Sequence, residues 1–194
     1  MPAQSPSIFT EPFQIFLGEK MRTAEMEVDR LSEDDLQSPA LGQSLQNIAN
    51  FKFQVAEIRP DEKTGKRRTE VRSFVDYGRH IQSKVDVLDI SIPYSGFPKS
   101  FSIAPTNGHT IESKATYQSS SGHLLVVTLD EDDALEVKLA TFISEVEDNL
   151  QKLGQDMENL RKRLLVHVQD RAQERLNAIK ARQEKNKGYS FPVE

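Results

Sequence analysis

The stretch LEVKLATFISEVEDNLQKLGQDMENLRKRL, residues 135–164, decides the fold of this chain. Its apolar residues recur at steps of three and four, which places them in one narrow stripe on a helix. The pattern predicts a long amphipathic helix, similar to a coiled-coil strand, over residues 131–187. Such a stripe cannot bury itself, so the helix needs a partner. The expected partner-binding residues are Leu139, Phe142, Val146, Leu150, Leu153, Met157, Leu160 and Leu164.

The two halves of this helix carry opposite charge. Residues 131–160 hold nine acids and two bases, whereas residues 161–187 hold nine bases and three acids. An antiparallel pair of such helices sets acid against base, whereas a parallel pair sets like charges together. Self-association is therefore one interpretation. The alternatives are that the charge merely suits the helix dipole, that the stripe meets another protein or the N-terminal helix, or that the helix folds back at Gly154.

Composition excludes several classes of protein. The chain has 194 residues, of which 37% are hydrophobic and 28% charged, and its formal net charge is −5. A globally basic nucleic-acid-binding surface is thus excluded, and the lack of cysteine excludes disulfides and thiolate metal sites. No apolar run is long enough for a membrane helix, and the N-terminus lacks the features of a secretory signal. We expect a cytoplasmic protein that does not enter membranes.

The first 50 residues are expected to be extended and then helical. Residues 1–11 are rich in Pro, Ser and Thr, and a helix is predicted over residues 12–31. Ser32 and Asp35 have the spacing of a capping box, which predicts a new helical turn there. A further short helix is predicted from Ser38, as N-cap, to Asn50.

From residue 51 to 129 the hydrophobic period changes from that of a helix to that of a strand. The sequence Asp61 to Lys66 predicts a hairpin loop, with a basic tip that includes Arg67 and Arg68. The strand over residues 85–92 is the most hydrophobic and is expected to be central. Strands are predicted at residues 51–55, 70–77, 85–92, 101–103, 110–117 and 124–129.

These elements predict an α+β protein. An antiparallel β domain of about five or six strands is expected between an N-terminal helix and the long C-terminal helix, whose start is marked by a capping box from Thr128 to Glu131. The predicted segments are residues 1–50 (extended and helical), 51–130 (β domain), 131–187 (long helix) and 188–194 (tail).

No motif fixes a catalytic activity. The four histidines have no metal-ligand spacing, and glycine-rich phosphate loops are absent. We therefore assign no catalytic, metal-binding or cofactor-binding residue and expect no cofactor. The nearest enzyme-like pattern is Asp89 followed by Glu112 and Lys114, the residue types that metal-dependent nucleases use, but alternating charge on an exposed strand explains it as well.

The basic half of the helix offers a second kind of binding site. Lysine and arginine side chains on one helix neutralise nucleic-acid phosphates, which makes binding sensitive to salt. Interleaved aromatic residues are missing before Tyr189, and acids are mixed in. The candidate nucleic-acid contacts are Arg161, Lys162, Arg163, Arg171 and Arg175.

The order of features from Val85 onward resembles a known group of proteins. An apolar strand leads into IPYSG at residues 92–96, and a hairpin and a helix that becomes Arg-rich follow before GYSFPV at residues 188–193. This resembles the N-terminal region of bacterial, defence-associated proteins that carry a restriction-endonuclease-like domain after it. The chain stops at Glu194, where such a domain would start, so the resemblance assigns no catalytic residue. It implies a sensing or oligomerising module, alone or as part of a longer protein.

The sequence therefore predicts a non-enzymatic interaction or oligomerisation module. We expect a homo-oligomer, or a complex with a helical protein, formed through the long helix. The resemblance would place it in a bacterial defence system, with a role in antiviral defence. Nucleic-acid binding through residues 161–187 is the alternative, and metal-dependent nuclease activity is a third.

Overall fold

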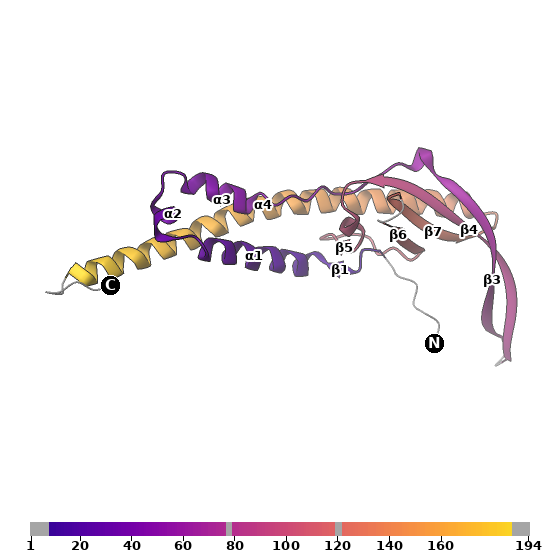
Figure 1. The fold of residues 1–194 in the computed structure, drawn as a ribbon. Coiled ribbons are helices and arrows are strands. Elements are labelled where there is room, and N and C mark those ends of the chain that lie inside the picture. The colour runs from indigo at the N-terminus through magenta and orange to yellow at the C-terminus, as the bar shows by residue number, and fades with distance from the viewer. Residues whose placement is uncertain (1–7, 77–78, 119–121, 188–194) are drawn as a thin grey trace. The chain divides into compact units, whose positions relative to one another are not determined.

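A computed structural model of the chain describes residues 8–76, 79–118 and 122–187 (Figure 1). Three expectations fall outside these residues. They are extended chain over residues 1–7, the C-terminal tail at 188–194, and the serine loop at 119–121, which is expected to join the predicted strands over 110–117 and 124–129 into a second hairpin. The described part contains helices and an antiparallel sheet, so the predicted α+β class is confirmed.

The helices are those of the prediction, with shifted ends. Helix α1 spans Phe13–Asp29, α2 spans Glu33–Gln37, α3 spans Leu41–Ala49 and α4 spans Leu135–Lys187. No helix among the described residues is long and apolar enough to cross a membrane.

The strands differ more from the prediction. They are β1 (Glu11–Pro12), β2 (Glu57–Ile58), β3 (Thr64–Asp76), β4 (Arg79–Ser95), β5 (Ile103–Ala104), β6 (Lys114–Gln118) and β7 (Leu124–Asp130). Two short 3₁₀ turns cover Pro60–Glu62 and Pro98–Phe101.

Strand β4 is the centre of a five-stranded antiparallel sheet, as its hydrophobicity predicts. The order is β2-β4-β7-β6, and β3 pairs with β4 along its whole length, from Thr64 opposite Ser91 to Asp76 opposite Arg79. Strand β7 pairs with β4 only from Val87 to Pro93. The pairing of β6 with β7 confirms the second predicted hairpin. A separate parallel pair joins β1 to β5.

The chain forms two compact units, each built from two separate stretches of sequence. Unit 1 comprises residues 1–13 and 54–156, and unit 2 comprises residues 14–53 and 157–194. The long helix α4 contributes its first part to unit 1 and the rest to unit 2.

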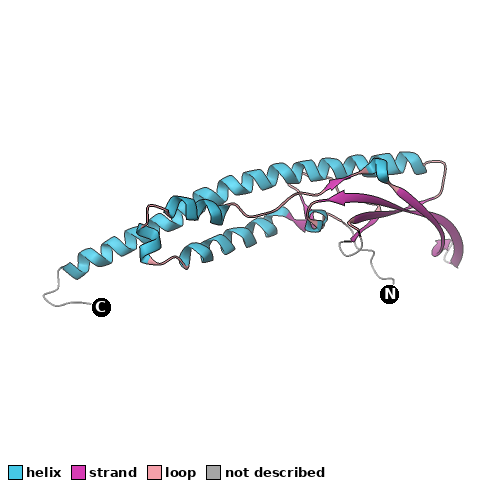
Figure 2. Ribbon diagram, turned by 45° about the horizontal axis from the view of Figure 1, so that its top comes forward, coloured by secondary structure: helices cyan, strands magenta, loops and turns pink. Residues whose placement is uncertain are grey.

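In unit 1, α4 covers the apolar face of the sheet (Figures 1 and 2). Strands β4 and β7 alternate buried and more exposed residues, as a half-buried strand must. Burying this apolar area is the main force that holds sheet and helix together. The core side chains that meet here include Ile90, Ile92, Leu125, Val127, Phe142 and Val146.

One polar side chain is buried in this helix. Asn149 is completely buried, and its amide donates to the backbone oxygen of His109 at 2.9 Å and accepts from the His109 N–H at 2.7 Å. Both backbone groups of one residue are thereby satisfied by one side chain, which offsets the cost of burying an amide.

In unit 2, α1 packs beside the second part of α4. Arg171 binds both carboxylate oxygens of Asp29 at 2.9 and 3.0 Å. On the other end of α1, the ring of Phe16 lies 5.4 Å from that of Phe53 and 6.2 Å from that of Phe51. The residues predicted as a strand at 51–55 are therefore aromatic anchors without regular structure.

Two local structures predicted from the sequence, a hairpin loop and a helix capping box, are wrong. Residues 61–66 do not close a hairpin, because Pro60–Glu62 is a 3₁₀ turn and β3 begins at Thr64. The strand that returns from β3 is β4, with Asp76 opposite Arg79. The residues Thr128 and Glu131 form no capping box, because Thr128 belongs to β7 and α4 begins at Leu135.

The shorter helix starts agree better with the sequence. The capping box at Ser32 is confirmed, since its hydroxyl accepts from the Asp35 N–H and the Asp35 carboxylate accepts from the Ser32 N–H. Helix α3 begins at Leu41, three residues after the predicted N-cap Ser38. The Ser38 hydroxyl instead accepts from the N–H of Ala40.

Glycine at position 154 lies inside α4 and does not end it. A Cβ atom placed there meets nothing within 4 Å, so packing does not require a glycine. Gly96 is different, because its φ is +86° and an added Cβ would lie 2.7 Å from the backbone oxygen of Val55.

We expect Gly154→Ala to raise the free energy of unfolding by about 0.5–1 kcal/mol, because alanine loses less entropy in a helix. Gly96→Ala should lower it, because its positive φ and the close carbonyl are incompatible with a side chain. Urea unfolding followed by circular dichroism measures both. A loss of stability in Gly154→Ala would show that α4 needs a bend at this residue.

Candidate functional site

The eight residues of the apolar stripe are core residues of the chain itself. Leu139, Phe142, Val146 and Leu150 belong to the unit 1 core, and all eight side chains are at most 6% exposed. An interface needs side chains that a partner can reach. The structure therefore gives the stripe another role, and association through it stays a prediction. The other buried members are Leu153, Met157, Leu160 and Leu164.

Several of the basic side chains proposed for nucleic acid are also used within the chain. Arg161 donates to the backbone oxygen of Phe53 at 2.8 Å, and its guanidinium lies 5.4 Å from the ring centre of Phe51. Such a stacked, hydrogen-bonded arginine has a structural role in unit 2.

Two further arginines of this set hold α1. Arg171 is bound to Asp29, and Arg175 donates to the backbone oxygen of Val28. Only Lys162 and Arg163 of the five candidates are exposed. Further along α4, Lys180, Arg182, Lys185 and Lys187 are exposed as well, so nucleic-acid binding by the basic end of this helix stays a prediction.

The candidate nuclease residues are not brought together as metal ligands. Asp89 lies on β4 and Lys114 on β6, where Lys114 is opposite Thr128 of the intervening β7. Glu112 lies before β6 and is exposed. No group of three or more His, Cys, Asp or Glu side chains within the described ranges has the geometry of a metal site.

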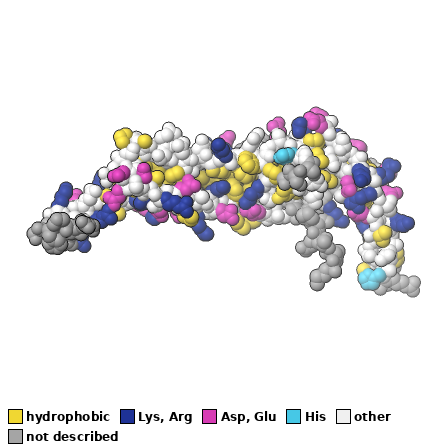
Figure 3. Space-filling model, in the orientation of Figure 1, with side chains coloured by type: hydrophobic (Ala, Val, Ile, Leu, Met, Phe, Trp, Pro, Cys, Tyr) yellow, Lys and Arg dark blue, Asp and Glu magenta, His cyan; other side chains and the backbone are white. Residues whose placement is uncertain are grey.

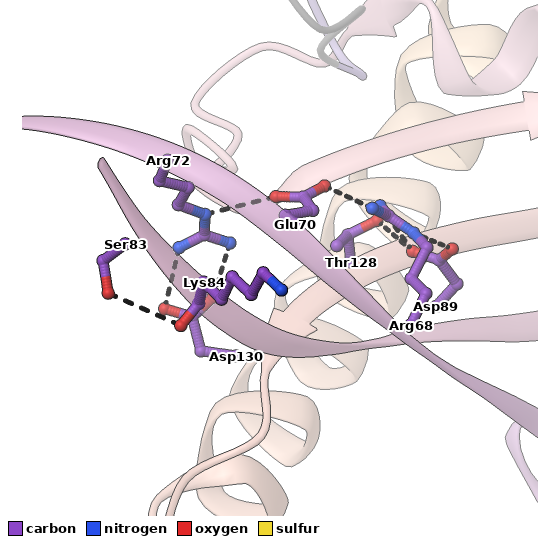
Figure 4. Close-up of polar contacts among 8 residues, drawn as sticks. All are labelled: Arg68, Glu70, Arg72, Ser83, Lys84, Asp89, Thr128 and Asp130. Carbon is purple, nitrogen blue, oxygen red and sulfur yellow. Dashed lines mark hydrogen bonds and ion pairs between the residues drawn. The ribbon is translucent and has the colours of Figure 1, made fainter.

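Asp89 is instead part of a charged network on the polar face of the sheet (Figure 4). Its carboxylate accepts from Arg68 at 2.5 and 3.1 Å and from the hydroxyl of Thr128 at 2.6 Å. Glu70 lies between Arg68 and Arg72, at 2.6 and 3.2 Å. These contacts join three strands side by side.

The network continues to β7 through Arg72. Its guanidinium reaches Asp130 at 2.6 Å, so an arginine of the outer strand β3 is tied across β4 to the next strand. The side chains of Glu70, Arg72 and Asp89 are between 22 and 27% exposed. Partial burial makes these pairs stronger than fully exposed ones.

The electrostatic effect on the acids is consistent with these bonds. The hydrogen bond from Arg68 lowers the pKa of Asp89, against the opposing effect of burial, and the Thr128 hydroxyl lowers it further. Arg68 likewise lowers the pKa of Glu70, with help from Arg72. Both acids are therefore held in the charged form, which suits structural ion pairs better than proton transfer.

Beyond this network the β3–β4 hairpin continues as a ribbon of two strands. Strand β7 stops pairing at Val87, whereas β3 and β4 stay paired out to Asp76 and Arg79. We call residues 70–76 and 79–85 the distal hairpin. Figure 1 shows it extending past the other strands of unit 1.

The distal hairpin carries exposed apolar side chains. Val71 is 62% exposed, Phe74 47%, Val75 69% and Ile81 45%. The register sets Phe74 directly opposite Ile81 on one face, and Val71 and Val75 share the other face. Hydrophobic side chains are visible on the distal hairpin in Figure 3.

The sequence pattern does not predict that these residues are exposed. The hairpin loop predicted at residues 61–66 would pair the predicted strand over 70–77 with the predicted strand over 51–55. The signal available in the sequence is the glycine at position 78, which separates two stretches of alternating residues.

No protein-family model, no curated protein and no solved structure matches this chain in comparisons with known proteins. The resemblance to defence-associated proteins therefore stays a prediction.

The Arg68–Asp89 pair should make the free energy of unfolding depend on pH in the acidic range. Because the pKa of Asp89 in the folded protein is lower than its unfolded value near 3.9, the pair stabilises the fold above that pH and this stabilisation is lost as the pH falls through the folded pKa. We expect Asp89→Asn to be less stable than the wild type at pH 7, and to lose less stability between about pH 4 and pH 2.

Urea unfolding at several pH values measures this difference. Asp61→Asn, in the exposed turn Pro60–Glu62, is the control and should follow the wild type. If the free energy of unfolding falls as steeply with decreasing pH in Asp89→Asn as in the wild type, the Arg68–Asp89 pair is not the source of the pH dependence.

Proposed function

We propose that this chain is a protein interaction module, and not an enzyme, whose binding surface is the distal hairpin. The observation that carries the proposal is the exposure of Val71, Phe74, Val75 and Ile81 on a ribbon of two strands. Single exposed apolar residues are common, but a group of them on one projecting element marks an interaction site.

The energetics of the ribbon support this proposal. Two strands without a third strand or a covering helix are marginally stable in water. Burying a large apolar side chain contributes about 1.5–3 kcal/mol. A partner that covers one face of the distal hairpin would therefore gain affinity and would also stabilise the ribbon itself.

The position of the hairpin is fixed by the rest of unit 1. Arg68 and Arg72 bind β3 to Asp89 and Asp130, just where the ribbon leaves the sheet. A binding element supported by such a base keeps its geometry and loses less entropy on association. The charged network thus supports the binding element, with no catalytic step required.

We therefore propose that the chain associates through the distal hairpin and not through the long helix. A cytoplasmic location and a place in a bacterial defence system remain proposals that follow from composition and from the resemblance. Nucleic-acid binding has less support, because Arg161, Arg171 and Arg175 are used inside unit 2.

Replacing Phe74 by serine tests the proposal. We expect the variant to fold like the wild type and to bind its partner about tenfold or more weakly, because each 1.4 kcal/mol of lost burial is a factor of ten. Light scattering over a range of protein concentrations, at low and high salt, measures self-association. Val137→Ser is the matched control, since Val137 is 69% exposed but lies on α4.

A monomer at all concentrations would direct the search to other proteins. A quantitative pull-down with the wild type and Phe74→Ser would then compare what each retains. If no protein depends on Phe74 and the chain never self-associates, the proposed function is wrong.

A further inference from the structure

The outer edge of β3 has no neighbouring strand among the described residues. Strand β3 pairs with β4 on one side over thirteen residues, and no other described strand pairs with it. A free edge of this length offers a row of backbone donors and acceptors to another strand. The first question is which strand fits it.

The charges along β3 favour a second copy of β3. Two identical strands related by a two-fold axis pair antiparallel, with one residue on the axis. With Val71 on the axis, Glu70 of each copy lies opposite Arg72 of the other, so two pairs of opposite charge form. Among registers centred on residues 69 to 73, only this one places opposite charges beside the axis without opposing like charges along β3.

The competing registers fail for identifiable reasons. Centring on Glu70 sets Arg68 against Arg72, and centring on Thr69 sets Lys66 against Arg72. Like charges directly opposite each other on neighbouring strands are destabilising. Centring on Arg72 pairs opposite charges only at the end of the strand, where Arg68 lies opposite Asp76, and centring on Ser73 sets Glu70 against Asp76.

The Val71-centred register also keeps apart the basic side chains that would otherwise prevent two copies of β3 from pairing. Lysine and arginine on an edge strand normally prevent self-pairing. In this register Arg67 lies opposite Val75 of the other copy and Arg68 lies opposite Phe74, so neither base meets a like charge. The basic clusters of the two copies are therefore kept apart.

We propose that two copies of this chain join edge to edge through β3, with Val71 on the two-fold axis. The proposal rests on the function proposed above and names its partner. The bonds of Arg72 to Glu70 and Asp130 use three of its five guanidinium N–H groups, which leaves two for the other copy. The dimer continues the sheet from one copy into the other and covers part of the exposed apolar surface.

Cysteine crosslinking tests the axis directly, because the natural chain has no cysteine. In Val71→Cys the two new thiols lie opposite each other, within disulfide reach. In Val75→Cys, the matched control on the same face, the register separates them by eight residues, or about 27 Å. Mild oxidation followed by non-reducing electrophoresis should give a covalent dimer for Val71→Cys and monomer for Val75→Cys.

A mixing experiment tests the charge pairs. Glu70→Arg alone sets arginine against arginine across the axis, and Arg72→Glu alone sets glutamate against glutamate, so each variant should self-associate at least tenfold more weakly. An equimolar mixture restores both opposite-charge pairs and should form a heterodimer. Light scattering and native mass spectrometry measure it, and the mixture itself shows that both variants are folded.

The outcomes separate this proposal from the more general one. A covalent dimer of Val75→Cys but not of Val71→Cys overturns the register, and no enhanced crosslinking at either position overturns the edge-to-edge dimer. If association still depends on Phe74 in that case, the hairpin is an interaction surface for another partner and only the further inference is lost.

Discussion

Burial of one side of α4 is the constraint on which the rest of the structure depends. The same helix supplies apolar side chains to the core of unit 1 and to that of unit 2. Because hydrophobic burial is the largest favourable term in folding, each unit is completed by a helix that also belongs to the other. A substitution at Leu150 or at Leu160 therefore acts first on folding, whichever function the chain has.

The two faces of the sheet are stabilised in different ways. Its apolar face is covered by the helix, whereas its polar face is held by ion pairs among Arg68, Glu70, Arg72 and Asp89. The pairs lie where β7 ends and only β3 and β4 continue. The strands are thus stabilised by charge at the point where hydrophobic support from the helix stops, and the side chains beyond that point stay in contact with water.

The class of the fold could be predicted from sequence because the signals for it are periodic. The stripe of α4, the hydrophobic strand β4 and the Ser32 capping box each depend on residues close in sequence, and all are present. Whether the stripe is buried by the chain itself or by a partner depends on tertiary contacts. No periodicity shows that α1 would take Arg171 and Arg175 as its neighbours.

The candidate surface escaped prediction for a related reason. A strand rich in valine and phenylalanine has the same local pattern whether its apolar residues are buried or exposed, and the turn alone decides what lies opposite. Placing the turn at residues 61–66 gave β3 the wrong neighbour. The core does not extend to Val71 and Phe74, which are exposed.

The buried amide of Asn149 has a consequence for how accurately α4 is placed on its sheet. An apolar stripe that repeats every turn permits the helix to slide by one turn and still bury leucines. Such a slide would leave the buried Asn149 amide without its partners, at a cost of about 1–3 kcal/mol for each unsatisfied group. The hydrogen bonds of this one side chain therefore fix the position of α4 along the sheet. Hydrophobic contacts alone would permit more than one position.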